Sequence, residues 1–179
     1  MKYLLSKAVD ATNKSRGDTR DPAVARKQGT RFAVLGMATL LTGQKLPALS
    51  MFGRGVTLLE QSWRAKHPEF QGGLGERVKA SVAFYEQTHQ NQTNRFLHVV
   101  GIPMIVGGAV GLLATPSFSP PWVASAGLFT TGWALNIAGH ALYEKNKPAF
   151  ADDPLAFMMG PLWDTKQLIT RARGKRTAA

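Results

Sequence analysis

The sequence has 179 residues, enough for one domain or for a small membrane protein. Lys and Arg number 22 against 11 Asp and Glu, a formal charge of +11, yet charged residues make up only 18% of the chain, below the roughly 25% of a typical soluble domain. Because Cys is absent, the sequence excludes disulfides, thiol nucleophiles and Cys-ligated zinc or iron–sulfur centres.

The positive charge is concentrated at the two ends, in a polar basic arm over residues 1–29 and a basic tail over residues 164–179. Basic charge is also typical of nucleic-acid binding, but the chain has no zinc-finger Cys and no RNP-like run. Its basic ends flank an uncharged block, as the positive-inside rule predicts for membrane proteins. We therefore expect membrane lipid around the protein, no nucleic-acid partner, and both termini in the cytoplasm.

The first apolar stretch follows the arm. Residues 32–42 are apolar but too few to span a bilayer, which takes about 20 residues, and a Gly- and Pro-containing break separates them from a second stretch at residues 56–63. We predict that residues 30–75 form short helices, shallow in the membrane or packed on it.

The centre of the chain, residues 96–143, contains no charged residue. Two apolar segments, residues 96–114 and 122–143, would form helices of about 28 and 33 Å, long enough to cross a bilayer. The proline-rich turn over residues 115–121 joins them. The sequence therefore predicts an all-α integral membrane protein with a two-helix transmembrane hairpin over residues 96–143, in a bacterial inner membrane rather than the endoplasmic reticulum. Gly107 and Gly111 would let the two helices approach closely.

Shorter elements flank the hairpin. An amphipathic pattern predicts a helix over residues 74–90. After the hairpin, Asp153 followed by Pro154 is a helix-start signature and opens a short segment that ends near residue 163, in the membrane interface. We take residues 76–163 as one membrane domain.

Five polar side chains lie inside or beside the hairpin: His89, Asn94, His98, His140 and Glu144. His98 and His140 are equally distant from residue 119 in the turn, and so are Asn94 and Glu144. In an antiparallel hairpin the two pairs therefore lie in successive layers. Ionisable groups at membrane depth are costly and tend to be functional. Imidazole and carboxylate donors without a thiolate suit a first-row metal such as Fe(II).

His89 can join this cluster only if the helix breaks. It lies nine residues before His98, which places the two side chains on opposite faces of an unbroken helix. We predict that the helix containing His89 ends before Asn94, because the polar run over residues 90–94 can break and re-cap it. In an unbroken helix, Glu144 or Asp152 would have to replace His89 as a ligand.

Two segments resemble a known family. The runs FYEQTHQNQTNRFLHVVGIP, residues 84–103, and GHALYEKNKPAFADDPL, residues 139–155, resemble the small membrane proteins related to the yeast 2-hydroxy fatty acid dioxygenase of phytosphingosine degradation. The resemblance implies an Fe(II)-dependent enzyme of lipid metabolism that uses O2 to shorten a 2-hydroxy fatty acid by one carbon, through α-oxidation.

The same resemblance implies roles for the polar residues. The leading iron ligands would be His89, His98 and His140. Glu144 would be a fourth ligand or would hold an imidazole tautomer. Asn94 would hydrogen-bond a ligand or an oxygen intermediate, and Tyr85 would donate a proton or simply pack.

Three other hypotheses remain. A di-iron desaturase requires about eight His in characteristic boxes, and this chain has 4. A non-enzymatic membrane adaptor would use the polar cluster to hold its helices together, and metal content separates this alternative from an enzyme. Haem ligated by His98 and His140 would show a Soret band.

Overall fold

A computed structural model describes residues 21–177, leaving out the side chains of residues 168 and 171–177. Within that range the chain is helical and contains no strand, which confirms the all-α class. Its elements in chain order are α2 (Pro22–Leu40), α3 (Lys45–Lys66), α4 (Leu74–Thr88), α5 (Gln92–Ala114), α6 (Pro120–Ala138), the π-helix η1 (Gly139–Glu144), the single 3-10 turn η2 (Ala149–Ala151) and α7 (Ala156–Thr177). Most of the expected arm, up to residue 20, lies outside the described residues.

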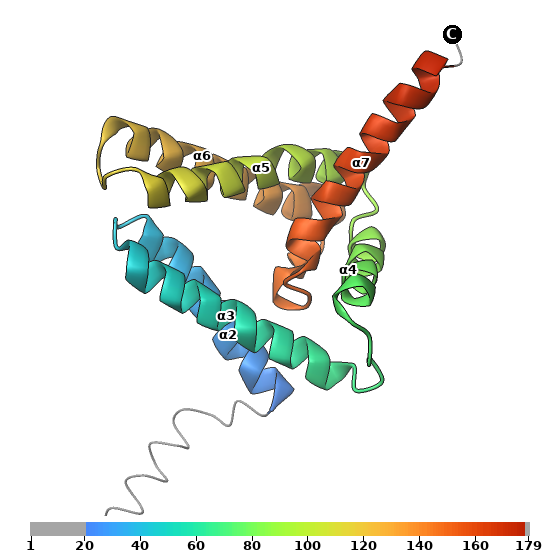
Figure 1. Cartoon of the computed structure of the whole chain (residues 1–179), viewed down its shortest axis with the longest axis horizontal. Coiled ribbons are helices and arrows are strands. Elements are labelled where there is room, and N and C mark those ends of the chain that lie inside the picture. The colour runs from blue at the N-terminus through green and yellow to red at the C-terminus, as the bar shows by residue number, and fades with distance from the viewer. Residues whose placement is uncertain (1–20, 178–179) are drawn as a thin grey trace, which may run out of the picture.

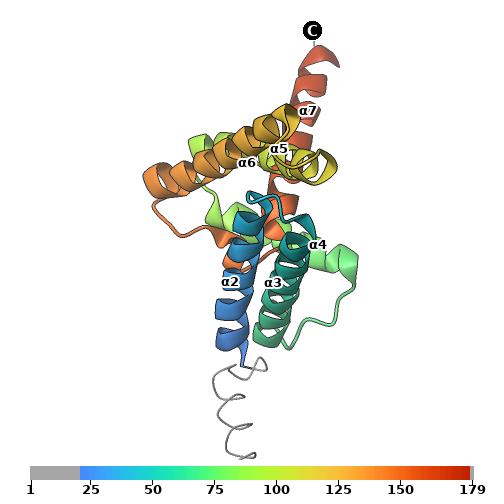
Figure 2. The same ribbon diagram turned by 90° about the vertical axis from the view of Figure 1, so that its left-hand side faces the viewer.

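Two antiparallel helical hairpins form the body of the molecule. α2 lies beside α3, and α5 lies beside α6, with the second hairpin crossing over the first (Figures 1 and 2). α4 and the first half of α7 pack together at the open ends of both hairpins, and α7 then extends beyond the body. This arrangement places the C-terminal end of α4 near the open end of the α5–α6 hairpin.

The first hairpin differs from the short helices expected over residues 30–75. Asp21 caps α2 by accepting a hydrogen bond from the Ala23 amide at 2.8 Å, with proline at the first helical position, so the helix starts inside the expected arm. α2 has 19 residues and α3 has 22, and glycines let their backbones approach closely. A Cβ on Gly36 would lie 2.6 Å from the Phe52 backbone nitrogen. The expectation of short helices is wrong because this packing stabilises two long ones.

The second hairpin follows the prediction in outline. α5 ends at Ala114, as expected, but α6 stays α-helical only to Ala138 and then widens into the π-helix. The backbones approach at Gly101 and Gly132, where a Cβ on Gly132 would lie 2.6 Å from the Gly101 carbonyl oxygen. The expected contact at Gly107 is wrong, since a Cβ there would meet nothing within 4 Å.

Only α5, among the described helices, is long and apolar enough to cross a membrane. α6 carries hydroxyl and amide side chains along its length, including Ser125, Thr130 and Asn136, which reduce its hydropathy. The expected transmembrane hairpin of two spans is therefore not confirmed, and one candidate span remains.

α7 is longer than the interfacial segment expected to end near residue 163. Asp153 caps its N-terminal end as predicted, because its Oδ1 accepts hydrogen bonds from the amides of Leu155 at 3.0 Å and Ala156 at 3.2 Å. The helix then continues to Thr177, through most of the expected basic tail. Asp164 on α7 accepts from Arg95 on α5 and so ties the two helices together.

A buried ion pair joins α4 to the start of α7. Arg77 donates to Asp153 at 2.7 and 2.9 Å, and the two side chains are only 2% and 1% exposed. Glu60 on α3 accepts a further hydrogen bond from Arg77 at 3.0 Å, and the guanidinium lies 3.6 Å from the Trp63 ring centroid. Burial alone would lower the pKa of Arg77, but its bonds to both carboxylates raise it, so the cation persists.

We expect Arg77→Ala to destabilise the fold by about 3–5 kcal/mol, because it leaves the buried Asp153 charge without its partner. Thermal unfolding followed by circular dichroism measures the loss. The control is Arg64→Ala, since Arg64 pairs with Glu60 at the surface and should contribute about 1 kcal/mol or less. Equal effects of the two substitutions would contradict this view of the core.

Candidate functional site

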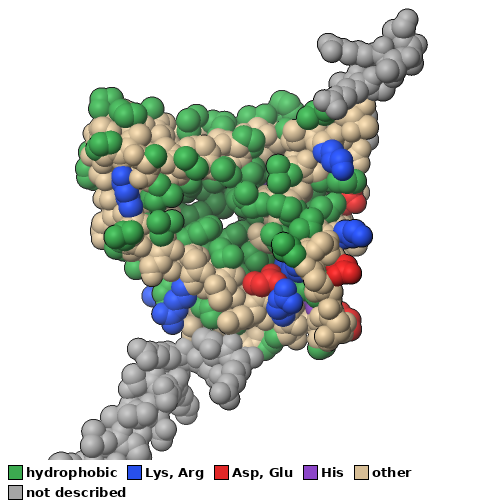
Figure 3. Space-filling model, in the orientation of Figure 1, with side chains coloured by type: hydrophobic (Ala, Val, Ile, Leu, Met, Phe, Trp, Pro, Cys, Tyr) green, Lys and Arg blue, Asp and Glu red, His purple; other side chains and the backbone are tan. Residues whose placement is uncertain are grey.

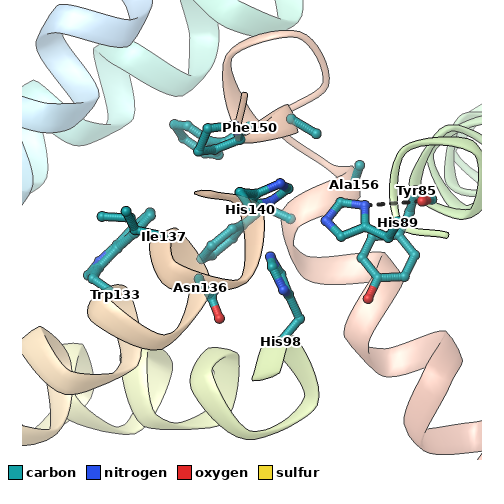
Figure 4. A pocket seen from close by; sticks show the side chains of 12 residues that line it. Tyr85, His89, His98, Trp133, Asn136, Ile137, His140, Phe150 and Ala156 are labelled. Carbon is teal, nitrogen blue, oxygen red and sulfur yellow. Dashed lines mark hydrogen bonds between the residues drawn. The ribbon is translucent and has the colours of Figure 1, made fainter. Parts of the chain in front are cut away.

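Three buried histidines converge at the open end of the α5–α6 hairpin. His89 follows α4, His98 lies on α5 and His140 lies on the π-helix, and their rings face one another (Figure 4). The ring centroids are 4.7 to 4.8 Å apart in all three pairs. One candidate ligand nitrogen from each ring lies within 4.8 Å of the other two. The expected layer of His98 and His140 is therefore confirmed.

A break between α4 and α5 brings His89 into this group. α4 ends at Thr88, and α5 begins at Gln92 with Asn91 as its cap. The Asn91 Oδ1 accepts from the Thr93 amide at 2.9 Å, which satisfies one of the amides that a new helix exposes. The predicted break before Asn94 is confirmed. Neither Glu144 nor Asp152 is therefore needed in place of His89 in the cluster.

The hydrogen bonds of the three rings fix which nitrogen remains free. Nδ1 lies 3.1 Å from the Tyr85 carbonyl oxygen in His89, 2.9 Å from the Asn94 carbonyl oxygen in His98, and 2.7 Å from the Asn146 Oδ1 in His140. Carbonyl and amide oxygens only accept, and the Thr88 hydroxyl, 3.0 Å from the His89 Nδ1, donates its proton to the Phe84 carbonyl oxygen, so each Nδ1 carries a proton. Each Nε2 therefore keeps a free lone pair, the arrangement found in histidines that bind metals.

The surroundings of His89 also keep its ring neutral. Burial lowers the pKa of His89 to about 3, and repulsion from His98 and His140 acts in the same direction. A neutral imidazole is the form that binds a metal ion.

Glu144 holds the break between the helices. Its carboxylate accepts from the backbone amides of Gln90 at 2.7 Å and Asn91 at 3.0 Å and from the Asn94 Nδ2 at 3.2 Å. Burial would raise the pKa of Glu144, but these hydrogen bonds lower it overall, so the carboxylate is ionised. The predicted layer of Asn94 and Glu144 is confirmed. Its oxygens serve these three donors, and the imidazole Nδ1 atoms are held by other acceptors, so ligation and tautomer holding by Glu144 both stay predictions.

Tyr85 packs against the His89 ring. Its ring stacks on the imidazole with centroids 4.0 Å apart, and its hydroxyl donates to the Asp164 Oδ2 at 2.8 Å. Burial, followed by the charge of Asp164, raises the pKa of Tyr85, so the phenol stays protonated. These contacts favour the packing role, and proton donation by Tyr85 stays a prediction. Asp152, the other alternative ligand, pairs instead with Arg26 at 2.7 Å.

The histidines line a small pocket of about 30 Å³, enough to admit a water molecule. Its other walls are mostly apolar, among them Trp133, Phe150 and Phe157. Asn136 also lines it, and its buried amide has no hydrogen-bond partner among the described residues. The sequence analysis missed Asn136, although it stands four residues before His140 and so shares its helix face.

Asn146 is a second residue that the sequence analysis missed. It accepts from His140 and donates its Nδ2 to the Thr88 carbonyl oxygen at 2.9 Å, linking the hairpin to the end of α4. The chain can turn back to this position because Lys145 adopts a left-handed conformation, with φ of 56°. Asn146 lies beyond the predicted span over residues 122–143, so the helical periodicity of that span could not place it beside His140.

A family profile described as 2-hydroxy-palmitic acid dioxygenase Mpo1-like matches residues 76–172, more than half of the chain. The chain belongs to the Mpo1-like family. The match covers α4 to α7 and all three clustered histidines, and it extends beyond the domain end expected at residue 163. α2 and α3 lie before it. The chain matches no curated protein and no solved structure.

We expect His89→Ala, His98→Ala and His140→Ala each to abolish tight metal binding, because each removes one of three converging nitrogens. Titration of the purified, metal-free protein with Co(II) or Fe(II) measures the affinity. The control is His67→Ala, since His67 lies outside the cluster, at the end of α3, where its ring stacks on Trp63 and its Nδ1 lies 2.8 Å from the Trp63 carbonyl oxygen. A variant of the cluster that binds as tightly as His67→Ala would remove that histidine from the site.

Proposed function

We propose that this protein is an Fe(II)-dependent dioxygenase that shortens 2-hydroxy fatty acids by one carbon. The observation that carries the proposal is the buried three-histidine group, whose Nδ1 atoms are all engaged and whose Nε2 atoms are free to converge on one ion. The description of the Mpo1-like family supplies the substrate class and the kind of reaction.

The donor set fits iron. Imidazole nitrogens bind iron as well as zinc, copper and nickel, and three protein ligands leave coordination positions open. The choice of iron among these metals rests on the dioxygenase family. Bound Fe(II) would supply the activation of O2 and coordination sites for the hydroxyl and carboxylate oxygens of the substrate.

The overall reaction balances without a further reductant. One 2-hydroxy fatty acid and one O2 give the fatty acid one carbon shorter, one CO2 and one water. The bond between the carboxyl carbon and the hydroxyl-bearing carbon breaks, and the latter becomes the new carboxyl group. All four electrons that reduce O2 come from the substrate, so no 2-oxoglutarate is needed.

The residues around the histidines would orient and enclose the reacting end of the substrate. The buried Asn136 amide, which has no partner among the described residues, would donate to a substrate oxygen. Asn94 would help to hold the ligand set, because its carbonyl oxygen fixes His98 and its amide binds Glu144. The apolar walls of the pocket would exclude bulk water.

A membrane location accords with a lipid substrate. α5 would cross or enter the bilayer, with its apolar segment beginning just after Arg95. Arg95, Lys145 and Lys147 stand at the open end of the hairpin, which the positive-inside rule places on the cytoplasmic side together with both termini. The candidate site would then open at the cytoplasmic surface of the membrane.

We expect the iron-loaded protein to consume O2 in the presence of 2-hydroxypalmitate and to release the acid one carbon shorter. An oxygen electrode and mass spectrometry of the extracted acids measure the two quantities. His98→Ala and His140→Ala should lose both, and His67→Ala should keep them. Wild-type protein that binds no metal and turns over no 2-hydroxy acid would instead favour the membrane adaptor, with the histidines holding helices together.

Glu144→Gln tests whether the carboxylate acts by holding the break between α4 and α5 or by binding the metal directly. We expect about 10- to 100-fold weaker metal binding, because the amide supplies one acceptor oxygen in place of two and loosens the break that positions His89. Metal titration measures the change, with Glu69→Gln, an exposed glutamate, as the control. Complete loss of metal, as in the histidine variants, would make Glu144 a direct ligand.

A further inference from the structure

An apolar groove lies between the two helical hairpins. Its volume is about 250 Å³, and Figure 3 shows hydrophobic side chains around a hollow in this face of the molecule. The α2–α3 hairpin forms one wall with Met37, Leu49 and Phe52, and α5 forms the facing wall with Val106 and Val110. The groove therefore lies where the first hairpin meets the second.

Contacts at both ends of the groove tie the first hairpin to its surroundings. At the tips, Lys45 donates to the Thr115 carbonyl oxygen, and the Ser117 hydroxyl donates to the Gly43 carbonyl oxygen at 3.1 Å. At the other end, Arg26 on α2 pairs with the carboxylate that follows η2. These contacts fix the position of the first hairpin at both ends of the groove.

The groove adjoins the histidine pocket. Trp133, Phe150 and Phe157 line both spaces. Phe157 stacks on Trp133 with ring centroids 5.4 Å apart. The rings of Phe157 and Phe150 meet edge to face, with centroids 5.6 Å apart. A ligand whose reactive end occupies the small pocket would therefore pass these aromatic rings and extend into the groove.

We infer that the groove binds the alkyl chain of the substrate, and that the α2–α3 hairpin sets which chain lengths are accepted. This inference rests on the proposed function for the identity of the polar end. A linear alkyl chain suits the groove because the lining is apolar, and each buried methylene favours binding about fourfold.

This assignment gives a role to the part of the chain outside the family match. α2 and α3 both precede residue 76, where the match begins, yet they form a complete wall of the groove. The histidines and the facing wall belong to the matched segment. Chain-length selection would therefore depend on a hairpin that lies outside the matched segment, while the site of chemistry lies within it.

Leu49→Trp tests the groove by filling it. Leu49 is 49% exposed at the groove, so a larger side chain can enter the space without disturbing the core. We expect kcat/KM for 2-hydroxypalmitate to fall at least tenfold, whereas kcat/KM for 2-hydroxyoctanoate changes less than twofold. The control is Leu46→Trp on the same helix, because Leu46 is 79% exposed and lies outside the groove. Equal effects on both substrates, or none on either, would overturn the assignment.

A second readout needs no turnover. Metal-free wild-type protein is irradiated with 2-hydroxypalmitate that carries a diazirine near the middle of its chain, and labelled residues are mapped by mass spectrometry. We expect label on groove residues of α3 and α5, and its loss in Leu49→Trp but not in Leu46→Trp. Label spread over the outward faces of the helices would indicate that the alkyl chain contacts the outer surface non-specifically, as a membrane lipid does, and would overturn the assignment.

The two readouts separate this inference from the proposed function. Groove labelling without turnover in any variant would keep the alkyl-chain site and reject the proposed reaction. Turnover with no chain-length effect and no groove label would keep the reaction and reject the groove.

Discussion

The candidate site depends on one carboxylate at the break between two helices. Glu144 accepts hydrogen bonds from two backbone amides and from the Asn94 side chain, and so fixes the end of the second hairpin to the gap between α4 and α5. Without a break, His89 and His98 would lie on opposite faces of one helix. With it, the three rings converge, each already oriented by a hydrogen bond at Nδ1. The arrangement shows how a group outside the ligand set can determine the ligand geometry.

Two buried polar networks make the surroundings of the site rigid. Asp164 on α7 accepts from the Tyr85 hydroxyl and from Arg95, so the ring that stacks on His89 is held between two helices. Arg77 and Asp153 pair at the other end of α4, where both charges are almost fully buried. Separating a buried ion pair leaves each charge buried without its partner, so the pair resists movement of α4 relative to α7.

The histidine pocket and the apolar groove are two adjoining spaces of different size and polarity. The pocket beside the histidines has a volume of about 30 Å³, whereas the groove between the hairpins, at about 250 Å³, is about eight times larger and almost wholly apolar. Three aromatic side chains stand where the two spaces meet: Trp133, Phe150 and Phe157. A molecule with a small polar end and a long alkyl chain matches this division, and the family description names such a molecule.

The sequence by itself determined the features that depend on distance along the chain. Equal spacing from residue 119 predicted that His98 faces His140 and that Asn94 faces Glu144, and the polar run after His89 predicted the break. Tertiary structure alone decided the rest. Arg77 meets Asp153 across 76 residues and Tyr85 meets Asp164 across 79, and no helical period relates such positions. The length of α2 and α3 likewise follows from their packing on each other, because a helix that is marginal alone is stabilised by the neighbour that buries its face. The groove lies where this hairpin meets the second.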